Sequence, residues 1–365
     1  MENLVSKQSQ MDFSSYKNKK VFLTGHTGFK GSWMLAWLHQ LGATVKGYSL
    51  APENEFDLYN TIHGDSLCES IIDDIRNKEN LEKAILSFEP DFIFHLAAQP
   101  LVRLSYEIPS ETFEVNVIGT AHVLDAVRKL KNQCQIVLIT TDKVYENLEW
   151  HYPYRESDRL GGYDPYSASK ACAELVINSY RNSFFNLNNY NEHKKSLASA
   201  RAGNVIGGGD WAKDRIIPDI VRALQNNEVI QVRNPKSIRP WQHVLEPISG
   251  YLHLGLKLLE NPIKFAEAWN FGPYAEDNLV VEDLVKMALE TWGNGNYHTP
   301  TLLNQPHEAG LLKLDINKTI NELNWKPKWN AKAAIEKTLN WYFHNTTSNS
   351  FQEVMDDIES YKKLK

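Results

Sequence analysis

Short apolar runs alternate with stretches of helical periodicity along most of the chain from Lys20 onward. Val21-Phe22-Leu23 predicts a buried strand. The stretch after it predicts a helix with one apolar face, formed by Trp33, Ala36, Trp37 and Leu38. Further strands are predicted at 44–50, 91–96, 135–140 and 197–202, and a long helix at 111–130. Such alternation is typical of the α/β class and predicts a Rossmann-type doubly wound parallel sheet.

The second half of the chain begins with a helix whose start is marked by Asp164-Pro165, an N-cap followed by a proline at the first helical position. Its predicted buried stripe consists of Ala168, Ala171, Cys172, Leu175 and Val176. Residues 182–195 are rich in Asn and charge and predict a surface loop. Beyond Gly207 prolines separate short elements, which predicts a smaller C-terminal α/β substrate lobe.

These patterns divide the chain into four segments. We expect a polar N-terminal extension, a dinucleotide-binding domain, a substrate lobe partly interleaved with the sheet domain, and a C-terminal tail, at 1–19, 20–206, 207–345 and 346–365.

Composition excludes several classes of function. The chain has 365 residues, is 42% hydrophobic and carries a net charge of −6, which argues against a nucleic-acid partner. No signal peptide or membrane span is evident, so we expect a cytoplasmic protein without a membrane partner. The three cysteines are odd in number and lack metal-ligand spacing, which predicts a reducing compartment and no metal site.

A glycine-rich turn lies between the first predicted strand and helix, in Thr24-Gly25-His26-Thr27-Gly28-Phe29-Lys30-Gly31. Glycines at this spacing let the backbone turn sharply and approach a pyrophosphate, and the helix N-terminus supplies N–H groups and partial positive charge. An ordinary strand-to-helix turn is the alternative interpretation. The position after the first strand favours a dinucleotide-binding loop.

One expected feature of an NAD site is missing. The second strand ends in Tyr48-Ser49-Leu50 without the carboxylate that usually binds the ribose, and without an arginine for a 2′-phosphate. This position therefore leaves NAD and NADP undecided. Asp74 and Ile75 follow a third strand and are predicted to meet the adenine, with an exposed acidic turn as the alternative.

The candidate catalytic residues fall in two motifs. Tyr166 and Lys170 are four residues apart and share one helix face. A nearby ammonium favours the phenolate, which can take a proton from an alcohol while its carbon gives up hydride. Thr141, Asp142 and Lys143 follow a predicted strand, where open α/β sheets place ligands. An acid and a base there suit an enzyme that also eliminates water; a solvated turn is the alternative.

Four motifs together resemble the extended short-chain dehydrogenase/reductase superfamily and, within it, the CDP-glucose 4,6-dehydratase family. They lie at 24–33, 140–147, 201–211 and 239–244, and the resemblance extends from about Lys20 to Tyr342. It implies that Tyr166 deprotonates the glucose 4-hydroxyl while hydride passes to NAD. It further implies that Asp142 and Lys143 remove the carbon-5 proton and protonate the departing 6-hydroxyl, after which hydride returns to carbon 6. The related dTDP-glucose enzymes have Glu in place of Lys143, which leaves open which of the pair is the acid.

The resemblance also implies the binding residues. Those expected at NAD are Gly25, Thr27, Gly28, Phe29, Lys30, Gly31, Asp74, Ile75, Leu96, Ala97, Ala98, Asn116, Thr140, Tyr166 and Lys170. Those expected at CDP-glucose are Arg103, Asn204, Arg215, Arg239, Trp241 and His243. Trp211 fits core and ligand contact equally. Members commonly form homodimers through two helices per subunit, here 111–130 and 165–180.

Two other functions remain open on the sequence. A different nucleotide-sugar 4,6-dehydratase, a 4-epimerase or an NADP-linked reductase would use the same Tyr166 and Lys170. The epimerase and the reductase do not need an acid/base pair at Asp142 and Lys143. A catalytically silent NAD-binding protein is the alternative from another class, and the intact catalytic residues argue against it.

Overall fold

The computed structural model describes residues 12–300, 309–344 and 349–364. A seven-stranded sheet forms its centre, in the order β11-β6-β5-β4-β1-β2-β3, with every neighbouring pair parallel. The strands are β1 (Lys20–Thr24), β2 (Thr44–Ser49), β3 (Glu69–Ile72), β4 (Phe92–His95), β5 (Cys134–Thr141), β6 (Lys195–Ala202) and β11 (Ala268–Phe271). The strand order reverses between β1 and β4, and ligands of open α/β sheets bind at such a point.

Helices cover both faces of the sheet and produce two hydrophobic cores. On one face lie α3 (Lys78–Phe88), α6 (Gly119–Lys129) and α7 (Pro165–Ser183), packed on strand residues such as Phe22 and Ile136. On the other lie α1 (Phe29–Gln40), α10 (Leu245–Glu260) and α13 (Ser350–Lys363), packed on Leu23 and Val137. The strands alternate their apolar side chains between these cores, because successive side chains of a strand point to opposite faces.

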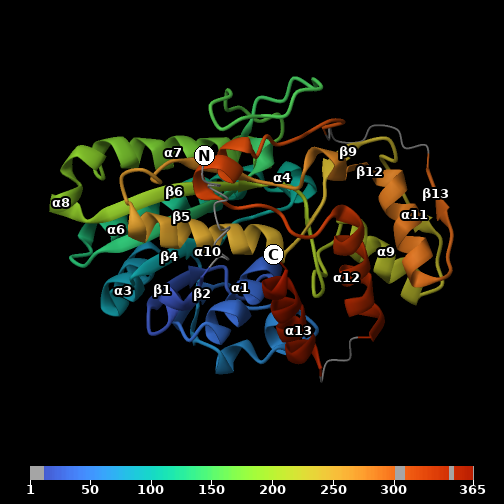
Figure 1. Cartoon of the computed structure of the whole chain (residues 1–365), viewed down its shortest axis with the longest axis horizontal. Coiled ribbons are helices and arrows are strands. Elements are labelled where there is room, and N and C mark those ends of the chain that lie inside the picture. Colours follow the sequence, from blue (N-terminus) through green and yellow to red (C-terminus); the bar gives the residue numbers. More distant parts are fainter. Residues whose placement is uncertain (1–11, 301–308, 345–348, 365) are drawn as a thin grey trace, which may run out of the picture.

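A smaller lobe stands beside the carboxyl edge of the sheet, at the right in Figure 1. Its helices are α9 (Ile216–Gln225), α11 (Val281–Trp292) and α12 (Ala331–His344). Its strands pair in twos, as β7 (Val205–Ile206) with β10 (Gln242–His243), β9 (Ile238–Pro240) with β12 (Asn278–Val280), and β8 (Ile230–Gln231) with β13 (Tyr297–His298). The chain returns from this lobe to the sheet through α10 and β11.

Short helical elements connect these parts. They are η1 (Ser14–Tyr16), α2 (Leu58–Thr61), η2 (Gly64–Ser66), α4 (Val102–Glu107), α5 (Pro109–Phe113), η3 (Glu114–Ile118), η4 (Asp142–Val144), η5 (Leu187–Asn189), α8 (Tyr190–His193), η6 (Ala275–Asp277) and η7 (Thr319–Leu323). The helix predicted at 111–130 is interrupted, since a π-helical turn at η3 separates α5 from α6. The loop predicted at 182–195 contains η5 and α8.

The predicted fold class is confirmed, but the predicted buried stripe of α7 is wrong in part. Leu175 is 58% exposed, whereas its neighbour Glu174 is only 4% exposed. The polar residue occupies the buried face because its carboxylate is paired with Arg201, which apolar periodicity does not register. Counting apolar residues therefore located the helix and misplaced the side that it buries.

Both chain ends carry structure beyond the expected polar extension and tail. Within the described part of the extension, Tyr16 is fully buried and donates a hydrogen bond to the Leu252 carbonyl. The described part of the tail forms α13, whose Tyr361 packs edge to face against Trp37 of α1. Each end is thus attached to the same face of the sheet.

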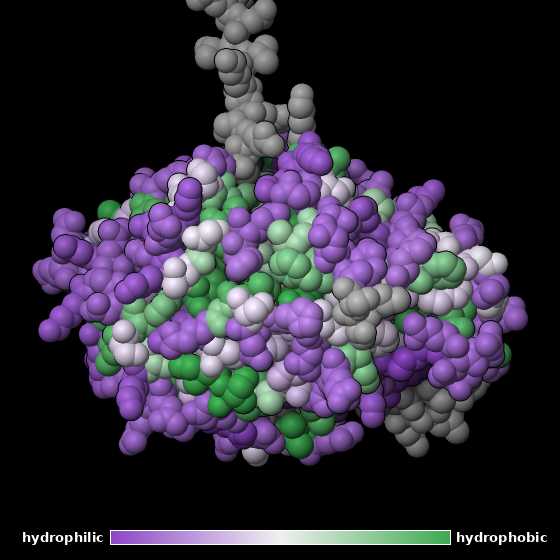
Figure 2. All heavy atoms as spheres, turned by 90° about the horizontal axis from the view of Figure 1, so that it is seen from below, coloured by the Kyte–Doolittle hydropathy of each residue, from purple (hydrophilic) through white to green (hydrophobic). Residues whose placement is uncertain are grey.

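The surface is largely hydrophilic on the face drawn in Figure 2, with hydrophobic side chains gathered in a few patches near its centre. Among the described residues, no helix is both long enough and apolar enough to cross a bilayer.

Candidate active site

The glycine loop is shaped by two close backbone approaches. Gly25 has a φ of +74°, and a Cβ there would stand 2.8 Å from the Ala97 nitrogen. A Cβ on Gly31 would lie 1.9 Å from the Gly25 carbonyl oxygen, closer than any side chain allows. Gly28 is the N-cap of α1 and has an ordinary φ of −75°. The loop therefore folds over the N-terminus of α1, where backbone N–H groups attract anions.

The end of β2 is connected to the same loop. The Thr27 hydroxyl donates to Ser49 Oγ and to the Leu50 carbonyl, each at 2.8 Å. At the end of β2, where an NAD site usually has a carboxylate for the ribose, this chain has Leu50, whose apolar side chain is 60% exposed. Farther along the edge, the Asp74 carboxylate accepts from Arg76 Nε and Nη2 at 2.9 and 2.6 Å. Its pKa is lowered, chiefly by these hydrogen bonds.

Residues after β4 and in η3 complete this edge. Leu96, Ala97 and Ala98 follow the strand directly, and Ala97 N–H donates to Thr24 Oγ1. The buried Asn116 amide accepts from Gln99 N–H at 2.9 Å and donates to Ser169 Oγ of α7 at 2.9 Å. Ile75 is buried against Gly119. Asn116 thus ties the loop after β4 to the helix that carries the candidate catalytic tyrosine.

Tyr166 and Lys170 lie on the buried face of α7, at 8% and 7% exposure. Burial raises the pKa of Tyr166 to about 12, which its hydrogen bond with Thr141 opposes. Burial lowers the pKa of Lys170 to about 8. Lys170 Nζ donates to the Ile139 carbonyl of β5 at 3.2 Å, and this bond aligns the helix with the strand.

The Thr141–Lys143 motif lies at the carboxyl end of β5 and in η4. Asp142 is fully buried; its Oδ1 accepts from Thr141 Oγ1 at 2.9 Å and from Lys143 Nζ at 3.3 Å. Its Oδ2 has no hydrogen-bond partner among the described residues. A buried oxygen without a partner is costly, which suits an atom that is completed by a ligand. Lys143 also donates to Asn204 Oδ1 at 3.4 Å.

Lys30 brings further positive charge into this region. Its Nζ donates to the Tyr251 hydroxyl at 3.3 Å. The pKa of Lys30 is lowered to about 7, chiefly by burial and also by the charges of Arg215 and Lys170, while Asp142 opposes the shift. Several cations around one buried carboxylate favour an anionic ligand.

Among the residues expected at the substrate, Asn204, Arg215 and Arg239 make polar contacts. Asn204 meets Lys143, and Arg215, at the N-cap of α9, donates to Asp210 Oδ2 at 2.9 Å. The pKa of Arg215 is raised, first by Asp210 and also by Tyr166, which places the guanidinium near the phenol. Arg239 of β9 donates to the carbonyls of Ile238, Ala309 and Gly310.

Other expected substrate contacts lie differently. His243 is fully buried, and its ring packs edge to face against Trp33 and Trp329. It therefore lies in the hydrophobic core. Apolar surroundings lower its pKa to about 3. Trp241 is buried as well. Arg103 lies on the helix α4 rather than in a loop, 3.8 Å from Asp214.

Trp211 is half-buried and packs edge to face against Phe56 and Tyr342.

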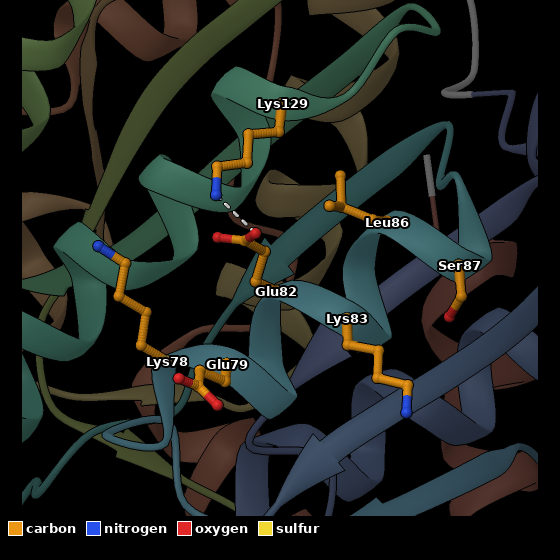
Figure 3. Close-up of a pocket in the computed structure, with 7 residues that line it drawn as sticks. All are labelled: Lys78, Glu79, Glu82, Lys83, Leu86, Ser87 and Lys129. Carbon is orange, nitrogen blue, oxygen red and sulfur yellow. Dashed lines mark hydrogen bonds and ion pairs between the residues drawn. The ribbon is translucent and has the colours of Figure 1, made fainter.

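A hollow on the outer surface has no such chemistry. Figure 3 shows it between α3 and α6, lined by Lys78, Glu79, Glu82, Lys83, Leu86, Ser87 and Lys129. Lys129 pairs with Glu82 and Lys78 with Asp125, each at 2.6 Å. None of the candidate catalytic side chains lines it. No cluster of side chains suited to a metal ion occurs within the described ranges.

Sequence reasoning missed a buried ion pair next to the candidate catalytic residues. Glu174 follows Lys170 by four residues, so it lies one turn along the same helix face. Its carboxylate is 2.9 Å from Arg201 Nη2, and both side chains are 4% exposed. The sequence contained a signal for this pair. A carboxylate four residues after Lys170 lies on the same helix face as Tyr166 and Lys170, so it faces the same strands.

Comparisons with known proteins identify the family of the chain. A model of the family described as GDP-mannose 4,6 dehydratase matches residues 22–338. CDP-glucose 4,6-dehydratase of Salmonella typhimurium is 51% identical over 91% of this chain and 92% of that protein. CDP-paratose 2-epimerase of Salmonella typhi is 28% identical over 88% of this chain and 98% of that protein.

Solved structures show the same fold. A dTDP-glucose 4,6-dehydratase from Streptomyces venezuelae, solved with NAD bound, superposes with a TM-score of 0.77 at 22% identity, covering 89% of this chain and 97% of that one. A UDP-glucose 4-epimerase from Thermotoga maritima has a TM-score of 0.73 at 20% identity, covering 89% and 98%. The chain therefore belongs to the GDP-mannose 4,6 dehydratase family, the nucleotide-sugar dehydratases of the extended short-chain dehydrogenase/reductase superfamily.

Proposed function

We propose that the chain is an NAD-dependent hydro-lyase that converts CDP-glucose to CDP-4-keto-6-deoxyglucose and water. The observation that carries the proposal is the pair formed by buried Asp142 and part-buried Lys143 beside Tyr166, in a chain 51% identical to a CDP-glucose 4,6-dehydratase. Removal of water needs one group that takes a proton and one that gives a proton, in addition to the group that serves the oxidation. Tyr166, Asp142 and Lys143 supply these three.

The glycine loop fits a dinucleotide. Its close approaches at Gly25 and Gly31 leave no room for a Cβ, and the N-terminus of α1 presents N–H groups to a pyrophosphate. Thr27, Gly28, Phe29 and Lys30 continue this loop. The edge residues assigned to the cofactor are Asp74, Ile75, Leu96, Ala97, Ala98, Asn116 and Thr140. When bound, NAD supplies a hydride acceptor and later returns that hydride.

Tyr166 serves the oxidation in this proposal. Its phenolate takes the proton of the glucose 4-hydroxyl, and because burial raises the pKa of Tyr166 to about 12, the phenolate needs nearby positive charge to form at neutral pH. The positive charge of Arg215 lowers the pKa of Tyr166, and a protonated Lys170 on the next turn of the helix is assigned the same effect. The Thr141 hydroxyl holds the reacting oxygen beside the phenol.

Asp142 and Lys143 serve the elimination. The unpartnered Oδ2 of Asp142 is a proton acceptor, and Lys143 Nζ is a donor 3.3 Å from the other carboxylate oxygen. Between them they take the carbon-5 proton, which the 4-keto group acidifies, and protonate the leaving 6-hydroxyl. Both groups are fixed to the same strand end, so they act on adjacent carbons of one bound sugar.

The substrate diphosphate is assigned to Arg215 and Arg239, whose guanidinium forks match phosphate oxygens. Asn204 is assigned to the substrate beside Lys143, and Arg103 to the sugar, whereas Trp241 is buried and contributes to the site through packing. His243 acts through packing, because its ring lies in the core.

Turnover with defined substrates tests the proposal. We expect CDP-glucose to yield a product lighter by one water, with dTDP-glucose and GDP-glucose converted more slowly. A product of unchanged mass and altered sugar configuration would show an epimerase instead. NAD binding without turnover of any nucleotide sugar would indicate a catalytically silent protein.

We further infer that the protein works as a homodimer in the cytoplasm. Ile118 and Leu175 are 48% and 58% exposed on neighbouring helices, as expected for an apolar surface that a second copy covers. The free cysteines Cys68, Cys134 and Cys172 suit a reducing compartment.

Introduction of a charge at the proposed interface tests the dimer. Leu175→Glu places a carboxylate on the proposed interface, and we expect the sedimentation coefficient to fall to that of a monomer. Leu148→Glu is the matched control, since Leu148 is also 58% exposed but lies in the loop after η4. A wild-type protein that sediments as a monomer would contradict the dimer.

A further inference from the structure

A buried ion pair connects the two catalytic motifs. Glu174 of α7 receives hydrogen bonds from Arg201 Nε and Nη2 at 3.0 and 2.9 Å. Ser199 Oγ donates to the same carboxylate at 2.8 Å. Because Arg201 and Ser199 belong to β6, the pair joins the catalytic helix to the sheet.

The same pair holds the chain on both sides of the Asp142–Lys143 motif. Thr140 Oγ1, before the motif, donates to Glu174 Oε1 at 2.6 Å. Tyr145, after the motif, has a buried hydroxyl that accepts from Arg201 Nη1 at 2.9 Å. The two anchors lie immediately outside residues 141–144, which carry the acid/base groups.

The outer end of the pair is fixed to the rest of the fold. The Tyr145 hydroxyl donates to Asn270 Oδ1 at 2.7 Å, and Asn270 belongs to β11 at the edge of the sheet. Arg201 Nη1 also donates to the Glu156 carbonyl at 3.0 Å, in the loop after η4. Every polar group in this chain of contacts is paired, so the arrangement resists displacement.

We propose that Glu174 and Arg201 are positioning residues that set Asp142 and Lys143 against Tyr166 and Lys170. The inference rests on the proposed function. Lys170 and Glu174 lie one turn apart on α7, and they bond to the adjacent β5 residues Ile139 and Thr140. A shift of this register moves the elimination groups relative to the oxidation groups. Displacements near one ångström are enough to slow a reaction by orders of magnitude.

Removal of one anchor without breaking the ion pair tests the proposal. Tyr145→Phe keeps the ring and deletes the hydroxyl that Arg201 and Asn270 share. We expect water loss to slow by on the order of tenfold while substrate-dependent formation of reduced nicotinamide persists. The KM for CDP-glucose should stay near that of the wild type. Glu174→Gln is less useful, because it leaves the Arg201 charge buried without a partner.

Ser199→Ala is the matched control. It removes a buried hydrogen bond to the same carboxylate at a site away from residues 141–144, and the balance between the two half-reactions should not change. Equal slowing of both half-reactions in Tyr145→Phe and Ser199→Ala would mean a structural role only and would overturn the proposal.

Amide hydrogen exchange supplies a readout that needs no turnover. We expect residues 141–146 to exchange faster in Tyr145→Phe than in Ser199→Ala and in the wild type. If the wild type fails to convert CDP-glucose, the proposed function fails, and the exchange measurement still decides whether the pair orders this segment. Unchanged exchange in both variants would refute the positioning role.

Discussion

At the scale of single residues, the site combines a tyrosine that resists ionisation with cations that favour it. Burial raises the pKa of Tyr166 to about 12 and lowers that of Lys170 to about 8. Burial disfavours the charged form of both side chains. Ionisation of the phenol therefore depends on the charges around it. The Asp142 carboxylate opposes that ionisation, so the groups proposed for the oxidation and for the elimination interact electrostatically.

Tyr166→Phe deletes the proposed base of the oxidation. We expect turnover to fall by about 10²- to 10⁴-fold, the usual contribution of a general base, while the dissociation constant for NAD changes little. Steady-state product formation and NAD titration measure the two effects. Tyr180→Phe is the control on the same helix. Among the described residues, the Tyr180 hydroxyl forms a hydrogen bond only with Asp125. Full activity in Tyr166→Phe would refute the assignment.

Replacement of the elimination groups should separate the two half-reactions. In Asp142→Asn and in Lys143→Met we expect product formation to drop by about 10²-fold or more, with reduced nicotinamide accumulating after CDP-glucose is added. Absorbance of the reduced cofactor and mass analysis of the sugar follow the two stages. Asp158→Asn, in the nearby loop, is the control. Full dehydratase activity in both catalytic-site variants would show that the elimination uses other groups.

At the scale of elements, the strand-to-helix turn from β1 to α1 is the most constrained part of the site. Backbone approaches there involve both neighbouring strands, since Gly25 N–H donates to the Tyr48 carbonyl of β2 and faces Ala97 after β4. The loop is therefore held by the sheet, which preorganises the N–H groups of α1.

Gly31→Ala should break this turn. The new methyl group would overlap the Gly25 carbonyl at 1.9 Å, so the loop must move and we expect the NAD affinity to fall by tenfold or more, on the order of 1.4 kcal/mol. Fluorescence titration with NAD measures the change. Gly272→Ala is the control, since its Cβ would meet Ile316 at an ordinary 3.5 Å. Equal NAD affinity in both variants would contradict a role of this loop in binding.

At the scale of the whole molecule, one buried carboxylate joins three distant parts of the chain. Glu246 of α10 accepts from the Lys328 and Trp329 N–H groups at 3.0 and 2.7 Å, and from the Tyr361 hydroxyl of α13 at 2.7 Å. Burial raises the pKa of Glu246 to about 7 from 4.5, although these hydrogen bonds lower it. We therefore expect the attachment of α13 to the sheet domain to depend on pH.

This pKa sets the direction of a pH effect on stability. The folded protein binds the Glu246 proton more tightly than the unfolded chain does, so the contribution is full below about pH 4.5 and is lost as the pH rises through about 7. In Glu246→Gln no carboxyl group titrates at this position. The difference between its free energies of unfolding at low and at high pH should therefore be smaller than that of the wild type by about 1–3 kcal/mol. Urea unfolding of both proteins at about pH 5 and pH 8 measures it. Parallel pH curves would disprove the linkage; Glu359→Gln, at the surface of α13, is the control.

Much of the fold and of the candidate site followed from local patterns. Alternating apolar runs and helices predicted the parallel sheet, because strands buried on both faces are continuously apolar. Gly25, Gly28 and Gly31 predicted the turn into α1, and the spacing of Tyr166 and Lys170 placed them on one helix face. Each of these signals lies within one element and its neighbours.

Contacts between distant segments could not be predicted in this way. His243 belongs to the motif at 239–244, which also contains Arg239, yet the structure encloses it between Trp33 and Trp329. On α7, burial of Glu174 and exposure of Leu175 invert the apolar pattern. A charged side chain can be buried only when a partner from another element meets it, and here Arg201 comes from β6.

The sequence by itself thus determined the fold class, the glycine turn and the identity of the candidate catalytic groups, because each depends on spacing along one short stretch. The tertiary structure decided which face of α7 is buried, that Thr140 and Tyr145 bond to the Glu174–Arg201 pair on either side of residues 141–144, and that Asp142 keeps one oxygen without a partner among the described residues. These features depend on the packing of β5, β6 and α7, and burial, pairing and pKa are set by the neighbours that packing supplies.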